Sequence, residues 1–229
     1  MFLKRRTLQA EYFDEPDRPQ ADLVEGYRIL GRFNRLFMLA RSFQTLVPHF
    51  LGEIRCRKLS LLDLGAGDGF LTKQLAGWAS EMGWDWKVTN FDLNPRALKL
   101  SGTDGCVAGS ALALPFREQS FDVVIASQMT HHFMADSEVR NHFKEAWRTT
   151  GGLLLITDLH RNLAFYLAMQ AILRISGVPA HFRSDALLSV KRGWRVNDWK
   201  SLADEAGIPE AKVWLYAGTR IMLQAQRKC

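Results

Sequence analysis

The chain has little cysteine and no long apolar run. Its 229 residues include three cysteines, Cys56, Cys106 and Cys229, which are scattered and odd in number. This pattern favours neither a disulfide framework nor a metal site, and it suits a reducing compartment. No apolar run is long enough to cross a bilayer. The basic start, Met1–Thr7, is followed by acidic residues rather than by the apolar core of a signal peptide, so we expect a cytoplasmic protein.

The sequence also lacks the pattern of a nucleic-acid-binding protein. Its net charge is +6 and its pI is about 9.4, and basic proteins attract anionic partners. The positive charges are dispersed, however, and aromatic residues do not alternate with them. We therefore expect no nucleic-acid partner. A row of arginines on one face of an expected helix, Arg28, Arg32 and Arg35, is either a solvated face or a contact for an anionic substrate or a lipid headgroup at the inner face of the membrane.

The most informative feature that is present is an apolar strand that runs into glycines at alternate positions. These glycines are Gly65, Gly67 and Gly69. A second apolar run, Trp86–Phe91, ends on Asp92 at the spacing that one helix and one return strand require. Glycines let the backbone turn tightly and lie against a ligand. Because a carboxylate at the tip of the next strand can accept both hydroxyls of a ribose, we predict a pocket for an adenosine-type cofactor.

The spacing of the glycines narrows the choice of cofactor. Dinucleotide-binding folds use G-x-G-x-x-G, in which the third glycine packs the helix closely while its N-terminus holds a pyrophosphate. Here the pattern is G-x-G-x-G, followed by the bulky Phe70 and Leu71. The spacing therefore favours a nucleoside cofactor over a dinucleotide.

Four segments together resemble the motifs of the class I S-adenosylmethionine-dependent methyltransferases. They are Asp63–Gly69, Asn90–Pro95, Gly109–Phe116 and Ser120–Ser127, in the order of that family. The resemblance implies S-adenosylmethionine as cofactor. It also implies an α/β, Rossmann-like, doubly wound fold with a seven-stranded, mostly parallel sheet that ends in an antiparallel hairpin. The fourth segment does not end in the Asn/Asp-Pro-Pro-aromatic tetrapeptide of amino-methylating nucleic-acid enzymes.

Carried over residue by residue, the resemblance implies a cofactor site at the carboxyl ends of the strands. The implied cofactor-binding residues are Asp63, Gly65, Ala66, Gly67, Gly69, Asp92, Leu93, Ser110, Ala111, Leu112, Ser127 and Gln128. The family usually has an aspartate, which accepts from the adenine amino group, at the position of Ser110. A serine makes only a neutral hydrogen bond, so either the affinity is modest or another group compensates.

The chain divides into an N-terminal helical cap, 1–50, and a methyltransferase domain, 51–229, with a lid insertion at about 160–192. Apolar residues recur at helical spacing over 21–47. The expected strands are 59–64, 86–92, 106–108, 121–126 and 152–157, with a hairpin formed by 212–217 and 220–226. The other expected helices are 70–82, one opened by 94–95, 136–148, and a last one that is capped by Asn197 and ends at Gly207.

The segment Asn162–Gly177 is apolar nearly all round, which is typical of a core helix or of a helix that covers something apolar. It follows the fifth expected strand, where methyltransferases of small molecules commonly insert a substrate cover. We therefore interpret it as a lid over a hydrophobic acceptor, with a fully buried core helix as the alternative. The apolar side of the 21–47 helix would form the facing wall.

Four titratable residues follow strand ends and are candidate bases. They are His131 and His132 after the fourth expected strand, and Asp158 and His160 after the fifth. Methyl transfer is an in-line displacement, so the protein must align the acceptor, exclude water and, for a hydroxyl, remove a proton. A histidine is well matched to deprotonating a phenol. We predict His131, His132 and His160 as catalytic candidates; the alternative is that they pack against the sheet or contact solvent.

The flanking segments give a finer resemblance, to a bacterial subfamily that accompanies type III polyketide synthases and methylates phenolic lipids or alkylpyrones on oxygen. These segments are Glu11–Asp17, Ile29–Leu36, Thr157–Arg161 and Ser184–Arg192. The resemblance implies an O-methyltransferase of secondary metabolism with a hydrophobic small-molecule acceptor. Two alternatives stay open: a carbon methyltransferase of the quinone-biosynthesis kind, and a non-catalytic partner subunit that binds S-adenosylmethionine.

Overall fold

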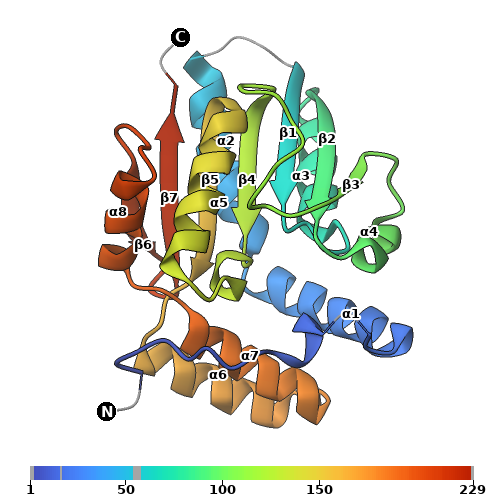
Figure 1. The fold of residues 1–229 in the computed structure, drawn as a ribbon. Helices are drawn as coiled ribbons and strands as arrows, with labels where there is room; N and C mark the ends of the chain where they lie inside the picture. Colours follow the sequence, from blue (N-terminus) through green and yellow to red (C-terminus); the bar gives the residue numbers. More distant parts are fainter. Residues whose placement is uncertain (1–2, 16, 54–57, 228–229) are drawn as a thin grey trace.

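A seven-stranded sheet runs through the centre of the protein, whose computed structural model describes residues 3–15, 17–53 and 58–227 (Figure 1). The strands are β1 (Lys58–Leu64), β2 (Asp85–Asp92), β3 (Cys106–Ala108), β4 (Phe121–Ser127), β5 (Thr150–Leu159), β6 (Lys212–Tyr216) and β7 (Arg220–Gln226). Their order is β3-β2-β1-β4-β5-β7-β6. Strands β1 to β5 pair in parallel, whereas β7 is antiparallel to β5 and to β6. The fold predicted from the sequence is confirmed.

Helices cover both faces of the sheet because consecutive strand residues point to opposite sides. On one face, α2 (Leu39–Glu53) and α3 (Phe70–Glu81) form a core in which Phe43 packs with Leu61. On the other face, α5 (Asp136–Thr149) and α8 (Val196–Glu205) form a core in which Phe143 packs with Leu62. Helix α4 (Pro95–Ser101) begins at an Asn94 cap, as predicted. The central strands β1, β4 and β5 are therefore packed on both faces.

The prediction of a single helix over 21–47 is wrong. The structure has α1 (Gln20–Leu36) and α2, and the chain turns between them at Met38, whose φ is +49°. The physical reason is that the two halves bury different apolar faces. Phe43 of α2 packs on the sheet, whereas Ile29 of α1 packs on a separate cluster at the carboxyl end of the strands, and one straight helix does not reach both.

The predicted cap of the last helix is also wrong, because Asn197 lies inside α8. The helix begins at Val196 with Arg195 as its N-cap residue. The backbone N–H of Arg195 donates to Asp198 Oδ2 at 3.1 Å. A carboxylate three residues beyond the cap satisfies this otherwise unpaired N–H group, which fixes the start of the helix two residues earlier than the side chain of Asn197 suggested.

A helical layer covers the carboxyl ends of the strands. Helices α6 (Leu163–Ile175) and α7 (Ala180–Arg192) form a hairpin there, and α1 and the N-terminal segment lie against it (Figure 1). Tyr166 and Met169 of α6 pack with Ile29 of α1 and Phe182 of α7. The apolar segment 162–177 thus contacts the N-terminal helix, as the sequence led us to expect, but only one of its faces is buried.

Two further features of the structure concern the cysteines and the length of the apolar helices. Of the three cysteines, Cys106 lies on β3 with its Sγ 3.1 Å from Ser101 Oγ, and Cys56 and Cys229 lie outside the described residues. Among the helices of the described chain, none is both long enough and apolar enough to cross a membrane.

Candidate active site

The glycine loop joins β1 to α3 at the carboxyl end of the sheet. Gly65, Gly67 and Gly69 have φ values of +72°, +56° and +69°, a left-handed region in which glycine has no steric cost. The N–H of Gly65 donates to the carbonyl of Phe91 at 2.8 Å. The N–H of Gly67 donates to Asp92 Oδ2, also at 2.8 Å. The loop is therefore tied to the end of β2, where the sequence placed the ribose-binding carboxylate.

Two carboxylates lie beside this loop. Asp63 is buried near the end of β1, and no residue of the described chain hydrogen-bonds or ion-pairs with its carboxylate. Burial, together with the charge of Asp92, raises the pKa of Asp63 well above its usual value. Burial also raises the pKa of Asp92, although the N–H groups of Asn94 and Gly67 and the charge of His132 act in the opposite direction. A buried carboxylate without a protein partner suits a cationic group of a ligand.

Helix α1 lies directly over the glycine loop. A Cβ atom on Gly67 would be 2.6 Å from Tyr27 Cε1, and a Cβ atom on Gly65 would be 2.6 Å from the Cβ atom of Met129. The loop therefore has glycine where a neighbouring side chain approaches the backbone. The approach of Tyr27 was not predicted, because helical spacing alone does not show which residue of a helix reaches a distant loop.

The residues implied for binding the adenine end of the cofactor lie after β2 and β3. Leu93 follows Asp92 and is exposed, and Ala111 is buried. Ser110 is exposed, and its hydroxyl accepts a hydrogen bond from the N–H of Leu112 at 3.2 Å. The serine that replaces the family's aspartate thus already uses part of its hydrogen-bonding capacity within the turn.

The remaining implied cofactor residues lie at the glycine turn and at the end of β4. The N–H of Ala66 donates to the carbonyl of Phe91 at 3.1 Å. The Ser127 hydroxyl is buried and has no hydrogen-bond partner among the described residues. Gln128 has φ +54°, and its Nε2 donates to Asn34 Oδ1 of α1 at 3.2 Å. These residues therefore line the same edge of the sheet as the glycine loop.

His131 and Asp158 form a buried pair across β4 and β5. His131 Nδ1 is 2.7 Å from Asp158 Oδ1, and the backbone N–H of His131 donates to Asp158 Oδ2 at 2.7 Å. Burial alone would raise the pKa of Asp158, but the charge and hydrogen bonds of His131 hold it below its usual value. When Nδ1–H donates to a carboxylate, Nε2 is left as the acceptor of the neutral ring.

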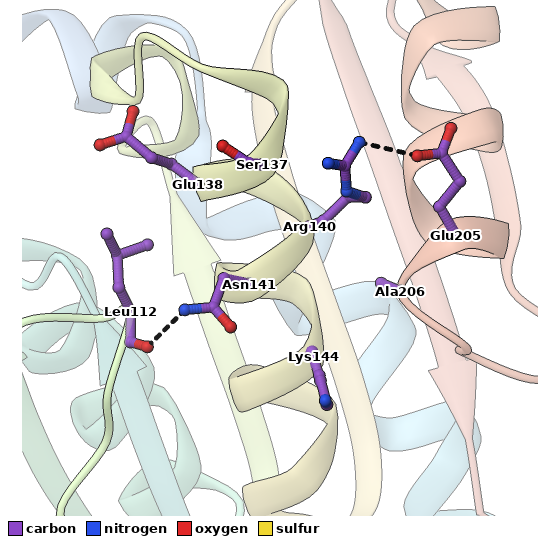
Figure 2. A pocket seen from close by; sticks show the side chains of 8 residues that line it. All are labelled: Leu112, Ser137, Glu138, Arg140, Asn141, Lys144, Glu205 and Ala206. Atoms are coloured by element: carbon purple, nitrogen blue, oxygen red, sulfur yellow. Dashed lines mark hydrogen bonds and ion pairs between the residues drawn. The ribbon is translucent and has the colours of Figure 1, made fainter.

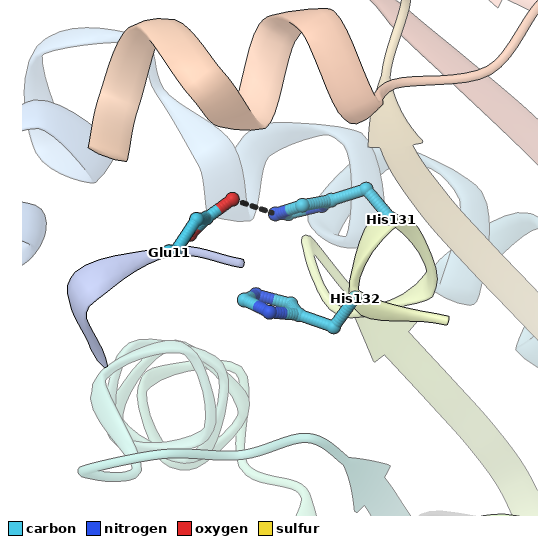
Figure 3. A group of neighbouring side chains, drawn as sticks. All are labelled: Glu11, His131 and His132. Atoms are coloured by element: carbon cyan, nitrogen blue, oxygen red, sulfur yellow. Dashed lines mark ion pairs between the residues drawn. The ribbon is translucent and has the colours of Figure 1, made fainter. Parts of the chain in front are cut away.

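The N-terminal segment brings two more carboxylates to the histidines. His132 Nδ1 is 2.6 Å from Asp14 Oδ1, and Glu11 Oε1 is 3.7 Å from His131 Nε2. The two imidazole rings are 4.3 Å apart, and Figure 3 shows Glu11 approaching them from the N-terminal segment. We call Glu11, Asp14, His131, His132 and Asp158 the histidine cluster.

A buried arginine pairs with two carboxylates of this cluster. Arg192 of α7 is fully buried, and its Nη1 is 2.6 Å from Asp14 Oδ2 and 3.4 Å from Glu11 Oε1. Glu11, His131 and His132 each offer a ligand atom within 4.8 Å of the others, a spacing compatible with a metal ion. Because the guanidinium already pairs with these carboxylates, we interpret the cluster as a site for proton transfer.

The contacts of Glu11, Asp14 and Arg192 with the histidines were not predicted from the sequence. Glu11 and Asp14 belong to the leader segment that resembles the finer subfamily, but nothing in their spacing connects them to residues more than a hundred positions away. The one available signal in the sequence was the finer resemblance. Both the leader and Arg192, the last residue of the segment Ser184–Arg192, belong to it.

His160 lies apart from the histidine cluster. Its Nδ1 is 3.1 Å from Asn162 Nδ2, and its N–H donates to the carbonyl of Thr219 at 2.8 Å. Burial, with the charges of Arg195 and Arg161, lowers its pKa. None of these contacts is with the cluster, so the structure does not bring the third predicted catalytic histidine to the other two.

A shallow surface pocket lies elsewhere, on the outer side of α5 next to α8 (Figure 2). Arg140 Nη1 donates to Glu205 Oε2 at 2.8 Å across it, and Asn141 Nδ2 donates to the carbonyl of Leu112 at 2.9 Å. Its charged, open lining contains no residue of the glycine loop or of the histidine cluster. We therefore place the candidate active site at the carboxyl edge of the sheet.

Comparisons with known proteins identify the domain. Residues 62–156 match the family model described as "Methyltransferase domain". Residues 62–156 thus resemble a methyltransferase domain. The chain is 26% identical over 139 residues to the uncharacterized methyltransferase-like protein C25B8.10 of Schizosaccharomyces pombe, an alignment that covers 58% of this chain and 50% of the relative. The chain thus matches about half the length of that relative.

Solved methyltransferases share the fold. The plantazolicin methyltransferase BpumL, solved in complex with a monoazolic desmethylPZN analog and SAH, superposes with a TM-score of 0.69 at 11% identity, over 95% of this chain and 93% of that one. Magnesium protoporphyrin IX methyltransferase from Synechocystis PCC 6803, solved with bound SAH, gives a TM-score of 0.54 at 13% identity, over 97% and 90%. At such identities the likeness shows the fold alone.

Proposed function

We propose that this protein transfers a methyl group from S-adenosylmethionine to a hydroxyl group of a hydrophobic small molecule. The observation that carries the proposal is the histidine cluster, which lies at the carboxyl edge of a methyltransferase sheet and next to an apolar helical layer. When bound, S-adenosylmethionine supplies the reactive methyl group on its sulfonium sulfur. The residues of the chain bind the cofactor, orient the acceptor and take up its proton.

The glycine loop and its two carboxylates fit the cofactor. Asp92 uses its oxygens to accept the N–H groups of Gly67 and Asn94, and each oxygen keeps a lone pair for a ribose hydroxyl. Asp63 is buried and has no partner among the described residues, so it suits the ammonium group at the amino-acid end of S-adenosylmethionine. Ser110 offers the adenine amino group only a neutral acceptor, which supports a modest affinity.

We assign proton uptake from the acceptor to His132. Its side chain is 39% exposed, against 4% for His131, so an acceptor hydroxyl can reach it. Its charge lowers the pKa of Asp92, which is expected if it lies toward the cofactor. Asp14 accepts from Nδ1–H and leaves Nε2 as the proton acceptor. His131, held by Asp158, lies against the ring of His132 and positions it.

The helical layer supports an apolar acceptor. Tyr166, Met169 and Leu173 of α6 form a cluster with Ile29 of α1 and Phe182 of α7 beside the carboxyl ends of the strands. An apolar cover excludes water and binds apolar surface. By analogy with the subfamily of the finer resemblance, we propose a phenolic lipid or a polyketide-like compound as acceptor.

The first test is calorimetric titration with S-adenosylmethionine and, separately, with NADH. We expect binding of S-adenosylmethionine and none of NADH. The second test is methylation of phenolic lipids by the wild-type protein and by His132→Gln, with His49→Gln as the matched control, because His49 is exposed on α2 and remote from the cluster. We expect kcat to fall about a hundredfold in His132→Gln and to be unchanged in His49→Gln.

Three outcomes would contradict the proposal. Failure to bind S-adenosylmethionine with or without acceptor would favour a non-catalytic partner subunit. Methyl transfer to a ring carbon, located by mass spectrometry and NMR of the product, would favour a quinone-type carbon methyltransferase. Unchanged kcat in His132→Gln would show that the acceptor reaches the enzyme already ionised or uses another base.

A further inference from the structure

Helix α6 has a wide apolar face that the rest of the described chain does not cover. Its buried side, formed by Tyr166, Met169 and Leu173, packs in the helical layer. Its opposite side is exposed over the whole length of the helix. The exposed residues of this side are Leu163, Ala164, Leu167, Ala168, Gln170, Ala171, Arg174 and Ile175.

The positions of these residues follow helical geometry. At 100° per residue they fall within one side of the helix, and all but Gln170 and Arg174 are apolar. Leu167 is 52% exposed and Ile175 is 86% exposed. A contiguous apolar surface of this kind on the outside of a protein marks an interaction site.

The exposed charged residues of α6 and α7 are basic. The two helices contain one acidic residue, Asp185, and four basic ones, Arg174, Arg183, Lys191 and Arg192, of which Arg192 is fully buried. Asp185 is buried and accepts the N–H groups of Tyr12 and Phe13 at 2.8 and 3.2 Å. Exposed cations remain at Arg174 on α6 and Arg183 on α7.

The start of the N-terminal segment adds two exposed cations, Lys4 and Arg5. Leu3 packs on the same apolar cluster as α6, and the exposed Lys4 and Arg5 follow it directly. Arg6 then anchors the segment, because its Nε donates to the carbonyl of Arg192 at 2.7 Å. Figure 1 shows the segment running along the α6–α7 hairpin.

We propose that the outer face of α6 docks on an anionic lipid bilayer. An apolar face flanked by arginine and lysine is the surface that inserts into the headgroup region of such a membrane. A second copy of the chain is a poorer occupant, because it would bring the same positive surface against its equal. The docked face is the side of α6 opposite the one that packs in the helical layer. An apolar acceptor dissolved in the bilayer would therefore lie next to the helices that cover the proposed acceptor site. The proposal concerns binding alone and stands without methyl transfer.

The test is cosedimentation of the full chain with vesicles, in the absence of cofactor and acceptor. The vesicles are made of phosphatidylcholine alone, or of phosphatidylcholine and phosphatidylglycerol in equal parts. We expect binding to the anionic vesicles, weakened by added salt, and little binding to the neutral ones. Leu167→Glu should weaken binding by roughly tenfold or more. The variant loses the burial of a leucine side chain in the membrane, and its carboxylate is repelled by the anionic headgroups.

The matched control is Met82→Glu. Met82 is 55% exposed and follows α3, which leads from the glycine loop to the opposite end of the sheet, so this variant should bind as the wild type does (Figure 1). Arg174→Gln combined with Arg183→Gln provides a second variant, which should weaken binding to anionic vesicles only. Melting temperatures of all variants check that each is folded.

Absence of binding to anionic vesicles would overturn the proposal, as would equal binding of Leu167→Glu and the wild type. A dimer that Leu167→Glu dissociates, detected by light scattering, with no vesicle binding, would overturn it in favour of a second copy. Because these measurements need no turnover, they are separate from the test of the proposed activity.

Discussion

The buried histidine of α5, His142, makes the protein less stable in acid. His142 is fully buried between Phe133 and Phe143, and neither ring nitrogen makes a hydrogen bond of good geometry with a described residue. Burial lowers the pKa of His142 from 6.5 to about 4, outweighing the backbone of Ala111 and the charge of Asp158. The native state therefore resists the proton that the unfolded state takes up readily.

Protonation of His142 in the unfolded state makes the free energy of unfolding depend on pH. Above pH 6.5 His142 is neutral in both states and contributes no pH dependence. Between 6.5 and about 4 the unfolded state binds the proton and the native state does not, so the free energy of unfolding falls as the pH falls. At 1.36 kcal/mol per pKa unit, the difference between 6.5 and about 4 amounts to about 3 kcal/mol once the pH is below both values.

The assay is urea unfolding of the wild type and of His142→Leu across this range of pH. The variant keeps an apolar side chain of similar size and removes the titrating group. Other titrating groups, such as His160, are present in both proteins and cancel in the comparison. We expect the stability of the variant relative to the wild type to rise by about 3 kcal/mol between about pH 7 and about pH 4. A constant difference across that range would refute the reasoning.

Three further predictions concern the site. Asp92→Ala removes the acceptor of two backbone N–H groups and of the ribose, so S-adenosylmethionine binding should weaken by about 2 kcal/mol or more in calorimetry, and unchanged affinity would show that the pocket is misplaced. Asp14→Asn leaves His132 without its carboxylate and should lower kcat by about tenfold while the affinity for cofactor is kept; equal kcat would make Asp14 purely structural. Gly67→Ala places a Cβ atom at φ +56° and against Tyr27, and should lower the free energy of unfolding by about 1–2 kcal/mol; a Tyr27→Ala background should relieve the clash but not the backbone strain.

The sheet and the glycine loop were predictable because their signals are local. The order of apolar runs, the glycines of 65–69 and Asp92 lie within short segments whose spacing follows from strand and helix geometry. The break at Met38 was not predictable in the same way. Apolar spacing continues through it, and only the need to bury two faces in different places separates α1 from α2.

The histidine cluster could be predicted from the sequence only in part. His131, His132 and Asp158 could be placed at strand ends, but His160, which satisfies the same rule, lies apart. Glu11 and Asp14 join the cluster from a segment with no regular pattern, because Arg192 pairs with both of them. Such contacts depend on the path of the chain in space, to which spacing along the sequence gives no guide.

By itself the sequence determined the fold class, the glycine loop and the apolar character of the segment 162–177, because backbone geometry and periodic burial are properties of neighbouring residues. Only the tertiary structure decided that Tyr27 covers the glycine loop, that carboxylates from the N-terminal segment hold the histidine cluster, and that α6 buries one face and exposes the other. The physical reason is that ion pairs, close contacts and exposure depend on distances between segments far apart in the chain, and folding fixes those distances.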